Sequence, residues 1–162
     1  MRPEGFLKPF GSADDNMFGF TEEQIHRYAR HIVLPQLGGK GQRKLLDSRV
    51  LVVGVGGLGS PVSLYLAAAG VGTIGLADND VVDVSNLQRQ VVHRNDKVGW
   101  PKVASAADAL CALNPDVNVV QHQAMFSSAN AMELVAGYDL VVECSDNFPS
   151  KYLANDACVL RG

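Results

Sequence analysis

The sequence predicts an α/β fold of the Rossmann-like, doubly wound type, with a mostly parallel sheet. Short apolar runs rich in β-branched residues recur along the chain, and a helical pattern separates each run from the next. A glycine-rich loop, GVGGLG, follows the first of these runs directly. The length of 162 residues and the 47% hydrophobic content suit one main core. Strands that alternate with helices imply parallel pairing with right-handed crossovers.

A capping box predicts the start of the first helix. Thr21 is followed three positions later by Gln24, and a helix is predicted from there to about Leu34. Pro35 and the glycines at 38, 39 and 41 are expected to end it, and a short helix over 42–46 follows. The apolar face of the first helix is expected to comprise Ile25, Tyr28, Ala29, Ile32 and Val33.

The remaining elements follow from apolar runs and from helix start and stop signals. Pro61 stands at a first helical position, Gly70 ends the same helix, and Pro101 opens the next. The predicted strands are Arg49–Val53, Thr73–Ala77, Val117–His122 and Asp139–Glu143. The predicted helices are Ser60–Ala69, Pro101–Leu113, Ser128–Ala136 and Lys151–Leu160.

Composition limits the partners and the compartment. Residues 1–19 mix small and polar types without a period, which predicts a disordered leader before a domain spanning 20–162. The net charge is −3 with Lys and Arg scattered, so no surface for nucleic acid is expected. No signal peptide and no apolar run of ~20 residues is present, which predicts a cytosolic (cytoplasmic) protein without membrane contacts. The three cysteines lack CxxC spacing, so they predict no zinc site and are expected to be small core residues.

The glycine loop indicates a nucleotide site. Residues Gly54–Gly59 read GxGxxG directly after a predicted strand and before a predicted helix, and such glycines let the backbone approach a nucleotide. Asp78 ends the next strand, where a carboxylate can bind ribose hydroxyls. The alternative is that the glycines only permit tight packing of strand and helix. The glycine loop and Asp78 are equally compatible with ATP and with NAD.

Two cations favour ATP. Arg89, in a polar loop, and Lys102, at the start of a helix, lie where a polyphosphate is expected. ATP carries about four negative charges, against about two for a dinucleotide, and requires more compensation. The alternative is that both are ordinary solvated surface residues. Asp146 follows the last predicted strand, where it can hold Mg²⁺ against phosphate oxygens or merely cap the next helix.

Seven segments in order carry a family resemblance: RYARHIVLPQLG, GQRKLLDSRVLVVGVGGLGSP, YLAAAGVG, SNLQRQVVH, VGWPKVASA, YDLVVECSDN and NDACVL. They resemble the ThiF/MoeB/ubiquitin-activating-enzyme family, especially its eukaryotic branch of adenylyltransferases and sulfurtransferases. The resemblance extends over Thr21–Gly162.

The resemblance implies roles for particular residues. Asp78 would bind the ribose, Asp146 would bind Mg²⁺, and Arg30 would reach across a homodimer into the partner's site. Arg30, Arg89, Lys102 and Asp146 are therefore the implied catalytic residues. The implied nucleotide site comprises Gly57, Asp78, Ser85, Asn86, Leu87, Gln88, Arg89, Lys102, Asp146 and Asn147.

The implied reaction is ATP-dependent adenylation of the C-terminal glycine of a ubiquitin-like sulfur-carrier protein, in molybdenum cofactor synthesis, tRNA thiolation or both. Family members continue further and carry zinc-binding CxxC pairs. We therefore expect a partial domain, truncated at its C-terminal side and without zinc ligands. Two alternatives remain, an inactive truncated module that pairs with a full-length subunit and an NAD- or flavin-dependent oxidoreductase.

Overall fold

The computed structural model describes residues 18–162, which divide into a first unit ending at Lys44 and a second unit of Leu45–Gly162. Of the expected leader, residues 1–17 lie outside the described residues. The first unit contains α1 (Glu22–Ile32) and the greater part of α2 (Gly38–Asp47).

Helix α1 begins as its capping box predicts. The Thr21 hydroxyl accepts from the Gln24 backbone N–H at 3.2 Å, and the Gln24 side chain accepts from the Thr21 N–H at 3.1 Å. Tyr28 is buried, as expected. The assignment of Val33 to the apolar face is wrong, because Val33 follows the last helical residue as the C-cap and is 53% exposed.

The first helix ends before Pro35 and the glycine cluster, but the expectation that the next helix starts only at residue 42, after the cluster, is wrong. Helix α2 already begins at Gly38, and the glycines lie inside it. A Cβ added at Gly39 would lie 2.6 Å from the Phe18 ring, and one at Gly41 would lie 2.5 Å from a Leu37 methyl carbon. These glycines therefore make room for neighbouring side chains, at a helix-propensity cost of about 1 kcal/mol each.

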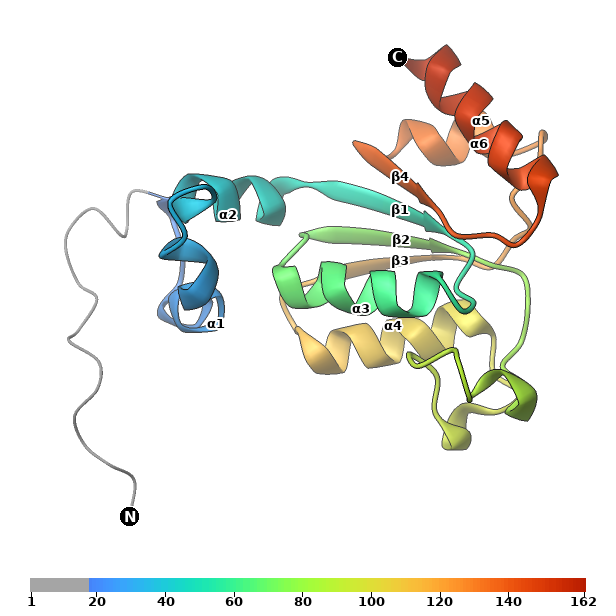
Figure 1. Cartoon of the computed structure of the whole chain (residues 1–162), viewed down its shortest axis with the longest axis horizontal. Coiled ribbons are helices and arrows are strands. Elements are labelled where there is room, and N and C mark those ends of the chain that lie inside the picture. Colours follow the sequence, from blue (N-terminus) through green and yellow to red (C-terminus); the bar gives the residue numbers. More distant parts are fainter. Residues whose placement is uncertain (1–17) are drawn as a thin grey trace. The chain divides into compact units, whose positions relative to one another are not determined.

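The second unit is built on a four-stranded parallel sheet in the order β3-β2-β1-β4 (Figure 1). Its strands are β1 (Arg49–Val53), β2 (Thr73–Ala77), β3 (Asn118–His122) and β4 (Leu140–Glu143). The chain starts in the middle with β1, adds β2 and β3 on one side, and then crosses to β4 on the other. This confirms the doubly wound α/β arrangement, and the crossing point lies between β1 and β4.

Helices cover both faces of the sheet (Figure 1). On one face, α3 (Gly59–Ala69) and α4 (Lys102–Leu113) pack beside each other. Val50 and Val52 of β1 point into the core on that side. On the other face, α5 (Ala131–Ala136) and α6 (Phe148–Arg161) cover Leu51 and Val53. The alternation along β1 explains why its run is apolar without interruption.

Several boundaries differ from the prediction. Helix α5 begins at Ala131 rather than Ser128, because Ser127 and Asn130 form a turn in which the Ser127 N–H donates to the Asn130 side chain at 2.9 Å. Helix α6 begins three residues earlier than predicted, because Asn147 caps it. The polar segment between β2 and α4 contains two short 3₁₀ helices, η2 (Val84–Asn86) and η3 (Asn95–Lys97).

Two of the three cysteines do not lie in the core. Cys144 is buried at the end of β4, as expected, but Cys111 and Cys158 are exposed on helices. Over the described part of the chain, no helix is both long and apolar enough to cross a membrane.

Candidate functional site

A cleft of about 540 Å³ lies at the carboxyl ends of β1, β2 and β4, within the second unit. Its volume falls in the range of small-molecule sites. The glycine loop, Asp78 and Asp146 all meet there, as the doubly wound topology predicts. The polar and glycine residues of its lining are Gly54, Gly56, Gly57, Asp78, Asn79, Asp80, Arg89, Gln90, Lys102, Ser145, Asp146, Asn147 and Ser150.

The glycines of the loop serve two different purposes. Gly54 has a φ of 89°, and a Cβ there would lie 3.0 Å from the Cys144 backbone. A Cβ at Gly59 would lie 1.9 Å from the Gly54 carbonyl oxygen. A Cβ at Gly57, in contrast, would meet only the flexible Arg89 side chain, at 3.7 Å. The first and last glycines are therefore required by the fold, whereas Gly57 leaves space that a ligand can use.

Asp78 is half-buried and shapes the glycine loop. One carboxylate oxygen accepts from the Val55 N–H at 2.8 Å, and the other accepts from the Asp80 N–H at 2.8 Å. An ionised carboxylate has about four lone-pair sites, so two bonds leave it able to accept from a ligand as well.

Lys102 is the most buried cation of the cleft. It is the first residue of α4, its side chain is 7% exposed, and its ammonium group lies 2.8 Å from an Asp80 carboxylate oxygen. Asp80 itself is 62% exposed. A buried ammonium group requires a partner, and Asp80 provides one from the open side of the cleft. Asp80 was not predicted as a site residue, although its position two residues after Asp78 indicates that it lies at the same edge of the sheet.

Arg89 lies over the glycine loop. Its side chain is exposed, its guanidinium group donates to the Ser85 carbonyl at 3.2 Å, and its aliphatic part lies near Gly57. The cleft thus has an exposed cation, Arg89, and a buried cation, Lys102.

The four residues before Arg89 do not line the cleft. Ser85 and Asn86 belong to η2, where Asp83 accepts from the Ser85 hydroxyl at 2.6 Å. That hydrogen bond holds the pKa of Asp83 below its usual value. The Asn86 side chain accepts from the Asp83 N–H at 3.3 Å. Ser85, Asn86, Leu87 and Gln88 therefore form a turn that carries Arg89 to the cleft, and their contact with a nucleotide stays a prediction.

Asp146 and Asn147 line the cleft after β4, with different functions. The Asn147 side chain caps α6 by accepting from the Ser150 N–H at 3.0 Å. The capping role that we considered for Asp146 therefore belongs to its neighbour, and the Asp146 side chain is exposed. Among residues 18–162, no group of three or more His, Cys, Asp or Glu is placed to hold a metal. A Mg²⁺ ion held by one carboxylate and substrate phosphates needs no such group.

Gln90 is a cleft residue that the sequence did not single out. Gln90 is 4% exposed, and its Oε1 is buried without a hydrogen-bond partner in the described part of the chain. Its amide nitrogen points toward Gly56. A buried amide atom without a partner costs about 1–3 kcal/mol. A buried amide oxygen beside a cleft can accept from an ordered water or from a bound ligand.

The sequence profile of the ThiF family matches residues 28–162 of this chain. The chain belongs to the ThiF family. The probable adenylyltransferase/sulfurtransferase MoeZ of Mycobacterium tuberculosis is 52% identical over 142 residues, which cover 88% of this chain and 36% of MoeZ. The SAMP-activating enzyme E1 of Haloferax volcanii is 55% identical over 139 residues, which cover 86% of this chain and 52% of that protein.

A solved structure with the same fold was determined with a nucleotide bound. The tRNA N6-threonylcarbamoyladenosine dehydratase TcdA of E. coli, in complex with ATP, has a TM-score of 0.81 at 28% identity. The match covers 86% of this ThiF-family chain and 57% of TcdA. The chain thus spans about a third to a half of the curated relatives described above, at 36% and 52%. The expected fold and the expected adenylyltransferase family are both confirmed.

Arg30 is the one expected site residue that belongs to the first unit, whereas the cleft lies within the second. It belongs to α1 in the first unit, and its side chain is exposed. Its expected action across a dimer stays a prediction.

Proposed function

We propose that this ThiF-family chain is the nucleotide-binding part of an enzyme that adenylates the C-terminal glycine of a ubiquitin-like sulfur-carrier protein. The observation that carries the proposal is the pairing of an open glycine loop at Gly57 with two cations, Arg89 and the buried Lys102. A triphosphate supplies the charge that these cations can neutralise. The relative named as an activating enzyme supports a ubiquitin-like carrier as the second substrate.

In the proposed reaction, the carrier's terminal carboxylate attacks the α-phosphorus of ATP. A new bond forms between the carboxylate oxygen and that phosphorus, the bond to the bridging oxygen breaks, and pyrophosphate leaves with its electron pair. Lys102 and Arg89 stabilise the growing charge, and Gly57 lets the backbone approach the nucleotide. Asp78 binds the ribose, and Asn147 with the turn at 85–88 encloses the nucleotide. Mg²⁺ held by Asp146 would neutralise part of the phosphate charge.

The wider setting belongs to the same proposal. The enzyme acts in the cytosol as a homodimer, and its product serves molybdenum cofactor synthesis, tRNA thiolation or both. Arg30 completes the partner's site.

The test is a calorimetric titration of the chain with ATP and, separately, with NAD, followed by pyrophosphate exchange with a carrier present. We expect ATP to bind and NAD to remain unbound. Binding of NAD alone would contradict the proposal and favour an oxidoreductase. Dimers that bind ATP without any exchange would favour an inactive partner module.

Asp78→Asn is expected to weaken ATP binding in a way that depends on the ribose hydroxyls. Because Asp78 also holds the Val55 N–H, a simple loss of affinity would not separate ribose binding from a deformed loop. The test therefore compares ATP with 2′,3′-dideoxy-ATP in both proteins. If Asp78 accepts from the ribose, the substitution weakens ATP by about tenfold more than the dideoxy analogue, since a hydrogen bond to a charged group contributes about 1.5–3 kcal/mol. Equal losses for both nucleotides would remove Asp78 from ribose binding.

Gln90→Met is expected to raise stability and lower ATP affinity together. Methionine has nearly the same shape but no polar atom, so the buried atom without a partner disappears and the free energy of unfolding rises by about 1 kcal/mol. The same change removes the amide that we expect to contact the nucleotide, with a loss of several-fold in affinity. Chemical denaturation and calorimetry measure the two effects. Unchanged ATP affinity in the stabilised variant would show that Gln90 faces no ligand.

A further inference from the structure

His93 is a buried imidazole beside the glycine loop whose two ring nitrogens both have partners. It is 5% exposed, its Nε2 lies 3.1 Å from the Val55 carbonyl oxygen, and its Nδ1 lies 3.0 Å from the Ser105 hydroxyl. Because a carbonyl oxygen can only accept, the hydrogen is on Nε2, and Nδ1 accepts from Ser105 in the neutral ring. His93 therefore joins the glycine loop to α4.

The Val55 residue of the loop is held on both of its backbone groups. Its N–H donates to Asp78 at 2.8 Å, and its carbonyl accepts from His93. The peptide bond between Val55 and Gly56 is planar and trans, so a carbonyl held toward His93 turns the Gly56 N–H away from it. Glycines flank Val55 on both sides, and without such bonds they would leave the loop many conformations. The contacts with Asp78 and His93 restrict the loop to one of these conformations.

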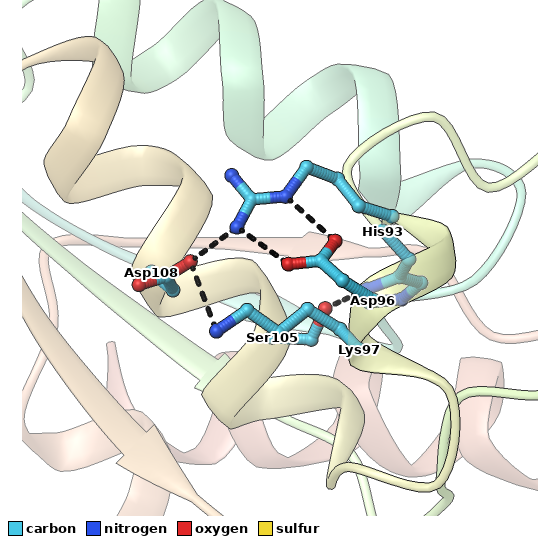
Figure 2. Close-up of polar contacts among 6 residues, drawn as sticks. His93, Asp96, Lys97, Ser105 and Asp108 are labelled. Carbon is cyan, nitrogen blue, oxygen red and sulfur yellow. Dashed lines mark hydrogen bonds and ion pairs between the residues drawn. The ribbon is translucent and has the colours of Figure 1, made fainter.

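The other end of the His93 contact leads to the cation of the cleft. Ser105 lies one helical turn after Lys102 on α4, so the two side chains share a helix face, and both are buried. Figure 2 shows the contact between His93 and Ser105 of α4 as a dashed line. The imidazole thus fixes the glycine loop relative to the helix that presents Lys102.

The segment that follows His93 is tied to the same helix. Arg94 lies 3.0 Å and Lys97 lies 3.4 Å from one Asp108 carboxylate oxygen on α4 (Figure 2). Lys97 also lies over the Trp100 ring, at 3.7 Å from its centroid. Exposed ion pairs contribute little individually, but together these contacts limit the movement of η3 along α4.

The surroundings of His93 favour the neutral form of its ring. Burial lowers the pKa of His93, and the nearby Lys102 charge lowers it further, against the opposing effects of the Val55 carbonyl and the Asp78 carboxylate. The neutral form is the one that accepts from Ser105 while donating to Val55.

We propose that His93 is a positioning residue, which holds the glycine loop and α4 in the mutual arrangement that receives the nucleotide phosphates. This inference rests on the proposed ATP binding. His93 does not line the cleft, so its effect passes through Val55 and through the Ser105 face of α4.

Two conservative substitutions separate the two hydrogen bonds of His93. The amide nitrogen of His93→Gln replaces Nε2 and can still donate to Val55, whereas the amide of His93→Asn replaces Nδ1 and reaches only Ser105. Ser105→Ala removes the second contact alone. His122→Gln is the matched control, because His122 is a half-buried histidine that lies outside the cleft lining and whose Nε2 lies 2.7 Å from the Tyr138 hydroxyl.

Affinities for ATP and for adenosine are measured in the same chain by calorimetry, below the unfolding temperature of every variant. We expect His93→Asn to weaken ATP about five- to tenfold and adenosine by much less, because the phosphates depend on both the loop and Lys102, whereas the ribose depends on the loop only through the Asp78–Val55 contact. His93→Gln should recover most of that loss, and Ser105→Ala should produce a smaller loss. His122→Gln should lower the melting temperature but leave both affinities unchanged.

The outcomes distinguish this inference from the proposed function. Failure of the unmodified chain to bind ATP would overturn the proposed function. ATP bound by the unmodified chain and equally tightly by folded His93→Asn would overturn the role of His93, as would equal losses for ATP and adenosine. If His93→Asn does not fold, Ser105→Ala decides, and unchanged ATP affinity in that variant would overturn the proposal.

Discussion

Replacement of Lys102 with methionine is expected to lower ATP affinity about 10- to 100-fold and leave the fold intact. A hydrogen bond to a charged group contributes about 1.5–3 kcal/mol, and each 1.4 kcal/mol corresponds to about tenfold in affinity. The methionine side chain fills the space of the lysine stem at the start of α4. Asp80, the partner left behind, is largely exposed, so no carboxylate becomes buried without a partner. The measurement is calorimetric titration with ATP, alongside thermal unfolding.

Lys97→Met is the matched control for that experiment. It removes the same charge from a side chain that is also mostly covered, where it contacts Asp108 and Trp100 instead of the cleft. We expect ATP affinity to change by no more than about twofold, because Lys97 does not line the cleft and its ion pair is partly exposed. An equal loss in both variants would reduce the role of Lys102 to general attraction by positive charge.

The structure separates residues that build the site from residues that meet a ligand. Gly54 and Gly59 are fixed by the close approach of backbone atoms, and any side chain at Gly59 would collide with the Gly54 carbonyl. Gly57 has no such constraint. Asp78 belongs to both groups, since it holds the loop and keeps lone pairs for a ligand. Loss of function on substitution therefore has different meanings at different positions of one motif.

The sheet was predictable because its signals are local. Residues 50–53 of strand β1 are an uninterrupted apolar run, and they are buried on both faces of the sheet. The edge at which Asp78 and Asp146 meet followed from the doubly wound order alone, since the carboxyl ends of parallel strands lie together. The start of α4 was also local, because Pro101 precedes Lys102 at the helix boundary.

The remaining parts of the site depend on contacts between distant segments. Val55 and His93 are joined by a hydrogen bond across 38 positions, and no periodicity records it. The buried amide of Gln90 is likewise a property of the folded cleft. The prediction for the glycines of α2 was wrong for a similar reason. The sequence alone does not distinguish a glycine that ends a helix from one that makes room for the Phe18 ring.

Arg30→Ala is the second substitution with a large expected effect, and it tests the proposed dimer. Arg30 is exposed on α1, so its removal should not alter the core of its own unit. If it stabilises phosphate charge in a partner's site, adenylate formation should fall about 10³-fold, as for arginines supplied in trans in phosphoryl transfer. Arg27→Ala, at another exposed arginine of the same helix, is the control and should retain activity. Pyrophosphate exchange with the carrier is the assay.

Mixing two inactive variants then separates action in trans from action within one subunit. An Arg30→Ala subunit keeps Asp146, and an Asp146→Ala subunit keeps Arg30, so a heterodimer has one complete site if Arg30 acts across the interface. Random pairing of equal amounts gives about half heterodimers, each with one active site of two, and activity should recover to about a quarter of the unmodified level. If Arg30 acts in its own subunit, every site lacks one of the two groups and mixing restores nothing. Absence of recovery in a mixture with demonstrated subunit exchange would therefore place Arg30 outside the partner's site, because every other requirement of the complementation is met.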